Sequence, residues 1–203
     1  MAAPPGFEEF VTFRSTRLLR AAGRLMRRRG YADAGVHEVL GAASAPKGSL
    51  YHHFPGGKEE LAAATIEAAG RVVGERIEEA FAAGEDMAAT VRWFARLLAR
   101  NLERSGYRDG CPVATVALEE SSESEPIHEA CAGAFLAWRE AIADRLRGDG
   151  LDPEQATRTA VLLLSAFEGA LIMARVLRDP SPLHQVADEL ARGLPGDGNG
   201  GWR

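Results

Sequence analysis

The side chains best suited to chemistry lie close together in one short segment near the N-terminus. Lys47, Ser49, Tyr51 and His52 offer ammonium, hydroxyl and imidazole groups within a few residues of one another. Such groups hydrogen-bond to base edges and to phosphate oxygens of DNA. Gly48 stands among them and has no side chain, so the backbone there can approach a duplex closely. The segment therefore predicts contact with double-stranded DNA.

Two short predicted helices must position these side chains. Apolar residues recur at helical spacing, and we expect one helix over 35–43 and a second over 46–53, joined at Ser44 and Ala45. This is the size of a helix-turn-helix, in which the second helix enters the major groove. Lys47 is then expected at the start of the second helix, where side chains reach the floor of the groove.

Flanking residues complete the motif. Asp33 lies near the start of the first short helix and can accept hydrogen bonds from its free N–H groups. Lys58 opens the next long helix, whose N-terminal dipole also favours a phosphate. Leu50 and Phe54 are four residues apart and can face the core together. We expect the adjoining long helix to supply part of that core.

The distribution of charge supports this interpretation, although the total charge does not. The formal net charge is −5, which alone argues against a general nucleic-acid binder. Residues 1–58 carry nine basic and four acidic side chains, hence +5; the remaining 145 residues carry 15 basic and 25 acidic ones, hence −10. Such an asymmetry indicates that one part of the chain meets a polyanion.

Several other classes of protein are disfavoured. The longest uncharged apolar stretch, 159–167, is short of the ~20 residues of a membrane span, and the N-terminus lacks a signal-peptide pattern. Cys111 and Cys131 are too few for a disulfide framework or a zinc site, and the His128–Cys131 spacing needs further ligands. A redox switch formed by the two cysteines is the less favoured alternative. No catalytic motif is present. We expect a cytoplasmic protein that does not bind a membrane, uses no metal or cofactor and is not an enzyme.

The chain as a whole is predicted to be all-α. Apolar residues recur at three- and four-residue steps, and alternating strand patterns are scarce. The first helix is expected to begin at Ser15 or Thr16, or further upstream, and to end at Gly30. Nine helices follow from the pattern: up to residue 29, then 35–43, 46–53, 58–83, 87–103, 113–120, 126–147, 153–178 and 182–192.

Residues 16–61 resemble the DNA-binding signature of TetR-family transcriptional repressors. The resemblance includes Ala21-Ala22 and Gly30-Tyr31, and it rests chiefly on Ala45-Pro46-Lys47-Gly48-Ser49-Leu50-Tyr51-His52-His53-Phe54 followed by Lys58-Glu59-Glu60-Leu61. A second stretch, Gly110-Cys111-Pro112-Val113-Ala114-Thr115-Val116-Ala117, resembles the LmrA/YxaF-like branch of the family.

The resemblance implies a homodimer that binds a palindromic operator. It implies a helix-turn-helix domain over 1–57 and a helical ligand-binding and dimerisation domain over 58–194. The glycine-rich composition of 195–203 predicts a disordered tail. The last two long helices would pair across the two-fold axis as a four-helix bundle. The matching residues that inherit DNA contacts are Lys47, Gly48, Tyr51, His52 and Lys58.

Two positions depart from the family pattern. Ser44 stands where the family usually has glycine, so a left-handed turn there carries a mild cost. Ala34 replaces a threonine that often caps the second helix and touches a phosphate, a contact that is then absent or supplied by His37. These departures are the only support for an alternative, a small-molecule-binding protein with a vestigial DNA-binding motif.

The C-terminal part offers candidates for a ligand pocket, because a pocket needs an apolar wall and a few polar groups. Apolar and aromatic residues at helical spacing are nevertheless more common in protein cores than in ligand pockets. Glu168 interrupts an apolar stripe, and we expect it to pair across an interface with an arginine such as Arg175 or Arg139. The acidic run over 119–125 is interpreted as a solvated helix end and loop. The candidate ligand-binding residues are Trp93, Phe94, Leu97, Cys111, Phe135, Trp138 and Phe167.

Overall fold

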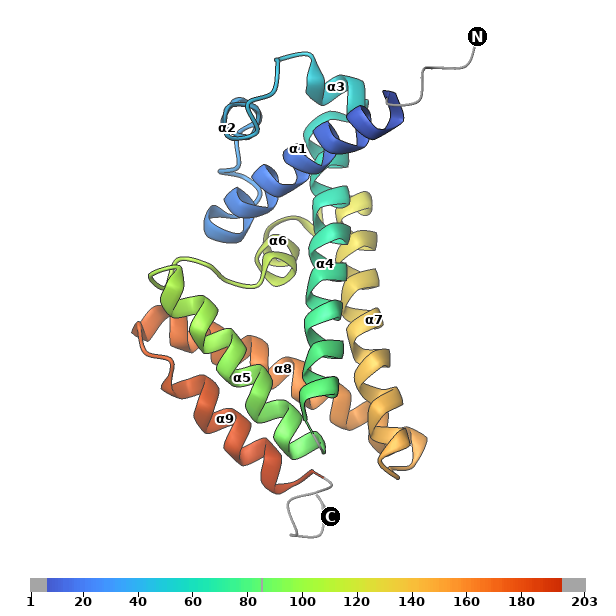
Figure 1. The fold of residues 1–203 in the computed structure, drawn as a ribbon, viewed down its shortest axis with the longest axis vertical. Helices are drawn as coiled ribbons and strands as arrows, with labels where there is room; N and C mark the ends of the chain where they lie inside the picture. Colours follow the sequence, from blue (N-terminus) through green and yellow to red (C-terminus); the bar gives the residue numbers. More distant parts are fainter. Residues whose placement is uncertain (1–6, 85, 195–203) are drawn as a thin grey trace. The chain divides into compact units, whose positions relative to one another are not determined.

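A computed structural model describes residues 7–84 and 86–194, and all regular secondary structure in these residues is helical (Figure 1). The predicted fold class is therefore confirmed. The predicted tail over 195–203 lies outside the described residues. The helices are α1 (Phe7–Arg29), α2 (Val36–Ala42), α3 (Ser49–His53), α4 (Gly57–Ala83), α5 (Met87–Arg104), α6 (Pro112–Glu120), α7 (Glu125–Gly148), α8 (Pro153–Leu177) and α9 (Ser181–Arg192).

Local sequence signals account for most helix ends. Gly30 adopts φ +82° and donates its N–H to Met26 O at 2.8 Å, so it ends α1 as expected. Asp86 accepts from Ala89 N at 2.7 Å and caps α5. Asp152 caps α8, whose first residue is a proline. Of the alternatives for the start of α1, the structure selects the upstream one.

The chain divides into two compact units. The first unit runs to Gly70 and resumes over Pro112–Ala134, and the second comprises Arg71–Cys111 and the chain from Phe135 onward. The helices α4 and α7 each contribute residues to both units. The boundary that we expected after residue 57 separates a DNA-binding part from a ligand-binding part, whereas these two units are defined by compactness. The functional boundary stays a prediction.

The first unit has a core built around α1, which packs against α2, α3 and α6. Leu50 and Phe54 are both buried in it, as expected. The start of α4 supplies Leu61 and Ile66, both fully buried, so the long helix does complete the core of the short ones. Without this contribution, α2 and α3 would bury too little apolar surface to hold a fixed geometry.

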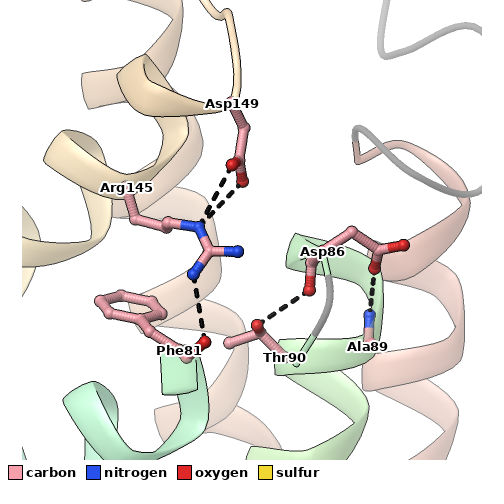
Figure 2. A network of polar contacts seen from close by, with 6 residues as sticks. All are labelled: Phe81, Asp86, Ala89, Thr90, Arg145 and Asp149. Atoms are coloured by element: carbon pink, nitrogen blue, oxygen red, sulfur yellow. Dashed lines mark hydrogen bonds and ion pairs between the residues drawn. The ribbon is translucent and has the colours of Figure 1, made fainter. Parts of the chain in front are cut away.

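The second unit is built on α5, α8 and α9, with α9 packed against the other two. Figure 2 shows a polar network at the end of α4. Arg145 Nε donates to both carboxylate oxygens of Asp149 at 3.2 Å, and the same guanidinium donates to Phe81 O at 3.2 Å. Thr90 Oγ1 donates to Asp86 O at 2.8 Å beside them. The network gives a carbonyl in the last turn of α4 a side-chain donor.

The helix α8 carries an exposed apolar stripe. By length and composition alone it is apolar enough to cross a membrane, with 33% of the relevant window buried. The expectation that no segment approaches a span missed this helix, because Glu168 divides its apolar residues into two shorter runs. The large exposed apolar side chains of α8 are Val161, Leu162, Ile172, Met173, Val176 and Leu177.

Candidate nucleic-acid interface

The turn between α2 and α3 has the geometry that a helix-turn-helix requires. Ser44 adopts φ +49°, the left-handed conformation expected there. Ala45 N donates to Leu40 O at 2.9 Å, and Ser44 N donates to Gly41 O at 3.0 Å. These two bonds form the Schellman arrangement that closes a helix. A serine at this position thus does not prevent the turn.

Two local expectations were wrong. Asp33 does not cap α2: the N-cap is Gly35, which makes no side-chain cap hydrogen bond. The tight turn in which Gly35 N bonds to Asp33 O carries the chain past the aspartate before the helix begins. The second helix of the motif starts at Ser49 rather than at residue 46, so Lys47 and Gly48 lie in the turn before α3.

The structure exposes most of the predicted DNA-contacting residues. Lys47, Gly48, His52 and His37 are exposed, and Tyr51 retains 66% of its surface. A tyrosine so exposed contributes little to the core of this chain, which leaves its ring and hydroxyl available to a partner. The row of exposed side chains therefore lies on the turn, on α3 and on α2.

Ser49 differs from its neighbours on α3. Only 8% of its surface is exposed, so its side chain faces the interior of the first unit rather than a partner. Its backbone N–H donates to Pro46 O at 2.9 Å. The expectation that Ser49 offers a hydroxyl to bases conflicts with this burial.

Lys58 is already engaged within the first unit. Its Nζ donates to Ala32 O at 3.1 Å and lies 4.2 Å from the centre of the Tyr31 ring. The pKa of Tyr31 is raised, first by burial and then by the charges of Glu120 and Glu59. Lys58 therefore braces the loop between α1 and α2, a role that the sequence pattern does not indicate.

Glu119 also contacts this loop. It is exposed near the end of α6, as the interpretation of a solvated acidic run predicts, and its carboxylate also accepts hydrogen bonds from Tyr31 N at 2.7 Å and Ala32 N at 3.2 Å. The partners are almost ninety positions away in sequence, so no local pattern could have identified them. In the same acidic region, Ser124 Oγ donates to Glu59 Oε1 at 2.5 Å.

The candidate ligand-binding residues all belong to the second unit. Phe94 and Phe167 meet edge to face with ring centres 5.4 Å apart, and Phe135 and Trp138 do so at 5.3 Å. Trp138 and Phe167 are buried; the half-buried candidates are Trp93, Phe94, Leu97, Cys111 and Phe135. The structure thus gathers these residues in one unit.

Glu168 is a partly buried residue in the same unit. Burial raises its pKa, and a hydrogen bond with Cys111 offsets part of that rise. Neither of these two causes is an arginine, and the pairing of Glu168 with Arg139 or Arg175 across an interface stays a prediction. Cys131 is also buried, burial raises its pKa, and its thiol lies 3.9 Å from Val113 O. A raised thiol pKa disfavours the redox alternative, because the thiolate is the reactive form.

Comparison with known families assigns both parts of the chain. The sequence model of the family described as bacterial regulatory proteins, tetR family, matches residues 18–65. The model described as transcriptional regulator LmrA/YxaF-like, C-terminal domain, matches residues 87–189. The first match contains the turn at Ser44 and all of α2 and α3.

Individual relatives agree with these matches. A helix-turn-helix-type transcriptional regulator of Mycobacterium tuberculosis is 35% identical, over 86% of this chain and 90% of its own length. The regulator LmrA of Bacillus subtilis is 30% identical, over 84% of this chain and 91% of its own. The crystal structure of a TetR regulatory protein from Rhodobacter sphaeroides is 28% identical, with a TM-score of 0.77 over 88% of this chain and 97% of its own.

Proposed function

The chain belongs to the TetR family of bacterial transcriptional regulators, and we propose that it is a ligand-responsive repressor that binds a palindromic operator as a homodimer. The observation that carries the DNA-binding part is the exposed row of Lys47, Tyr51 and His52 beside an intact left-handed turn at Ser44. In a dimer, two such rows would lie about one DNA turn apart, or a modest multiple of it. Such a protein works in the cytoplasm, where its operator is.

We assign the DNA contacts according to exposure. Lys47 and His37 are proposed to contact phosphates or base edges, Tyr51 and His52 to read or position bases, and Gly48 to admit the backbone. Ser49 is left out because its side chain is buried. Lys58 acts mainly by bracing the loop that carries Ala32, and its ammonium group adds to the positive potential of the surface.

The dimer is proposed to form through the exposed apolar stripe of α8. Val176 retains 75% of its surface in the single chain, and the stripe continues along the helix through Ile172 to Val161. A second copy would cover it isologously, which removes a large apolar surface from water. Because the second copy would cover the stripe, α8 can be as apolar as a membrane span in a protein that we do not expect to bind a membrane.

The effector is proposed to be a small, hydrophobic molecule bound in the second unit. Most of the candidate contacts there are aromatic or apolar. The carboxyl of Glu168, which follows Phe167 in the sequence, is the proposed polar group of the site. A ligand with higher affinity for the form that cannot bind DNA would release the operator by shifting the population. The long helix α4 contributes residues to both units and is the proposed mechanical link.

A vestigial DNA-binding motif is the weaker alternative. It rested on the departures at Ser44 and Ala34, and Ser44 adopts the required conformation. Selection of bound duplexes from a random DNA pool separates the two hypotheses. A functional DNA-binding motif enriches a palindromic duplex, whereas a vestigial motif enriches none. A selection that enriches no palindrome would refute the proposed function.

Variants then test the contact assignments on the enriched duplex. Lys47→Ala should weaken binding and reduce the slope of log affinity against log salt by about one phosphate contact. Tyr51→Phe should weaken binding and leave that slope unchanged. Ser122→Ala, an exposed hydroxyl outside the motif, is the control. Wild-type affinity in both Lys47→Ala and Tyr51→Phe would overturn the site assignment.

A further inference from the structure

The carboxylate of Glu119 holds the loop that joins α1 to α2. One oxygen, Oε2, accepts from both Tyr31 N and Ala32 N, at 2.7 and 3.2 Å. These two N–H groups follow the end of α1, and hydrogen bonds to a carboxylate are stronger than those between neutral groups. The loop is held from its other side by Lys58, which donates to Ala32 O. A single short segment is thus fixed by one acidic and one basic side chain.

Gly30 permits this approach. A Cβ at Gly30 would lie 1.6 Å from Glu119 Oε1, so a side chain there would displace this carboxylate from the loop, and φ +82° also favours glycine. Glycine at this position therefore leaves room for the Glu119 carboxylate in addition to ending α1.

The helix α6 is itself held in the first unit. Its residues Val113 and Val116 are fully buried there, and Glu119, near the C-terminal end of the same helix, makes the loop contacts.

We propose that Glu119 is a positioning residue for the DNA-reading helices α2 and α3, because its carboxylate holds the loop at Tyr31 and Ala32 that leads into α2. This inference rests on the proposed function for its consequence, the control of operator binding. The mechanical part is independent of DNA, because it concerns only how firmly the loop is held.

Hydrogen exchange measures the mechanical part on the full chain without DNA. In Glu119→Ala, the amides of Tyr31 and Ala32 should exchange about tenfold faster. Glu119→Gln keeps an acceptor oxygen and should stay closer to the wild type. Glu123→Ala, an exposed acidic residue just beyond α6, is the matched control and should leave both amides unchanged. Unchanged exchange in Glu119→Ala, with native helicity retained, would overturn the proposal.

Operator affinity gives a readout with a distinctive sign. If Glu119 acted only through its negative charge, Glu119→Ala and Glu123→Ala would both bind DNA more tightly. A positioning role requires weaker binding in Glu119→Ala and rescue in Glu119→Gln. Tighter binding in Glu119→Ala would refute positioning. If the wild type enriches no duplex at all, the proposed function fails and the exchange result still decides the mechanical part.

Discussion

The ammonium group of Lys58 lies 4.2 Å from the centre of the Tyr31 ring and donates a hydrogen bond to the carbonyl of the next residue, Ala32. A lysine at the start of a long helix beside a DNA-binding motif is expected to face a phosphate. In this chain its side chain instead connects α4 to the loop after α1. The same residue therefore contributes to the stability of the reading helices before any DNA is bound.

Lys58→Gln should lower the free energy of unfolding by about 1 kcal/mol, since the substitution removes the cation–π contact and weakens the bond to Ala32. Urea denaturation followed by circular dichroism measures this. Lys47→Gln is the matched control, because its side chain is exposed and lies in the turn before α3. Equal stability of the two variants would show that Lys58 does not brace the loop.

Ser44→Gly should stabilise the protein by about 0.5–1 kcal/mol. Ser44 holds φ +49°, which costs energy for any residue with a Cβ and almost none for glycine. The midpoint of urea denaturation should rise with an unchanged slope. Ser122→Gly, an exposed turn residue outside the left-handed region, should gain nothing. A loss of stability in Ser44→Gly would contradict the strain assigned to the turn.

Val176→Glu should raise the dissociation constant of the dimer by roughly 100-fold or more, because a charge would be buried without a partner at the interface. The protomer should stay folded, since this side chain is 75% exposed in the single chain. Sedimentation velocity distinguishes monomer from dimer. Leu118→Glu, at a residue of α6 that is 83% exposed, serves as the control. A dimer that survives Val176→Glu would place the interface elsewhere.

Deletion of α9 is a poorer test of the same interface. Leu183 and Leu190 are buried, and α9 packs against α5 and α8 within the chain. Removing 182–192 would therefore open the core of the second unit and would not report on the dimer alone.

The buried carboxyl of Glu168 makes stability depend on pH. Its folded-state pKa is raised above the ordinary value of 4.5, mainly by burial, so the folded state retains the proton that the unfolded state has released. The free energy of unfolding therefore decreases as pH rises from about 4.5 through the raised pKa. Glu168→Gln removes this decrease, so its stability relative to wild type should grow with pH across that interval.

Urea denaturation at a series of pH values from 4 upward measures this difference. Glu129→Gln, an exposed glutamate on α7, is the control for the loss of a negative charge. A constant difference between wild type and Glu168→Gln across the series would show that the carboxyl is not desolvated in the folded protein.

Local patterns in the sequence determined the helical fold and the place of the DNA-binding motif. Glycine and proline end helices, and apolar residues at three- and four-residue steps bury one face, so the nine predicted helices correspond to those in the described residues. The motif around Lys47 was visible for the same reason: its residues are consecutive. The turn at Ser44 was predicted even though serine is not its preferred residue.

Contacts between distant residues required the tertiary structure. The sequence indicates only that Glu119 is a solvated acidic residue. The structure shows that its carboxylate accepts hydrogen bonds from the N–H groups of Tyr31 and Ala32. Ser49 was expected at the DNA surface, but the packing of α3 turns its side chain inward. Residue type and spacing set which helices form and which faces are apolar. Packing in three dimensions decides which polar groups meet, because side chains remote in sequence satisfy one another's hydrogen bonds.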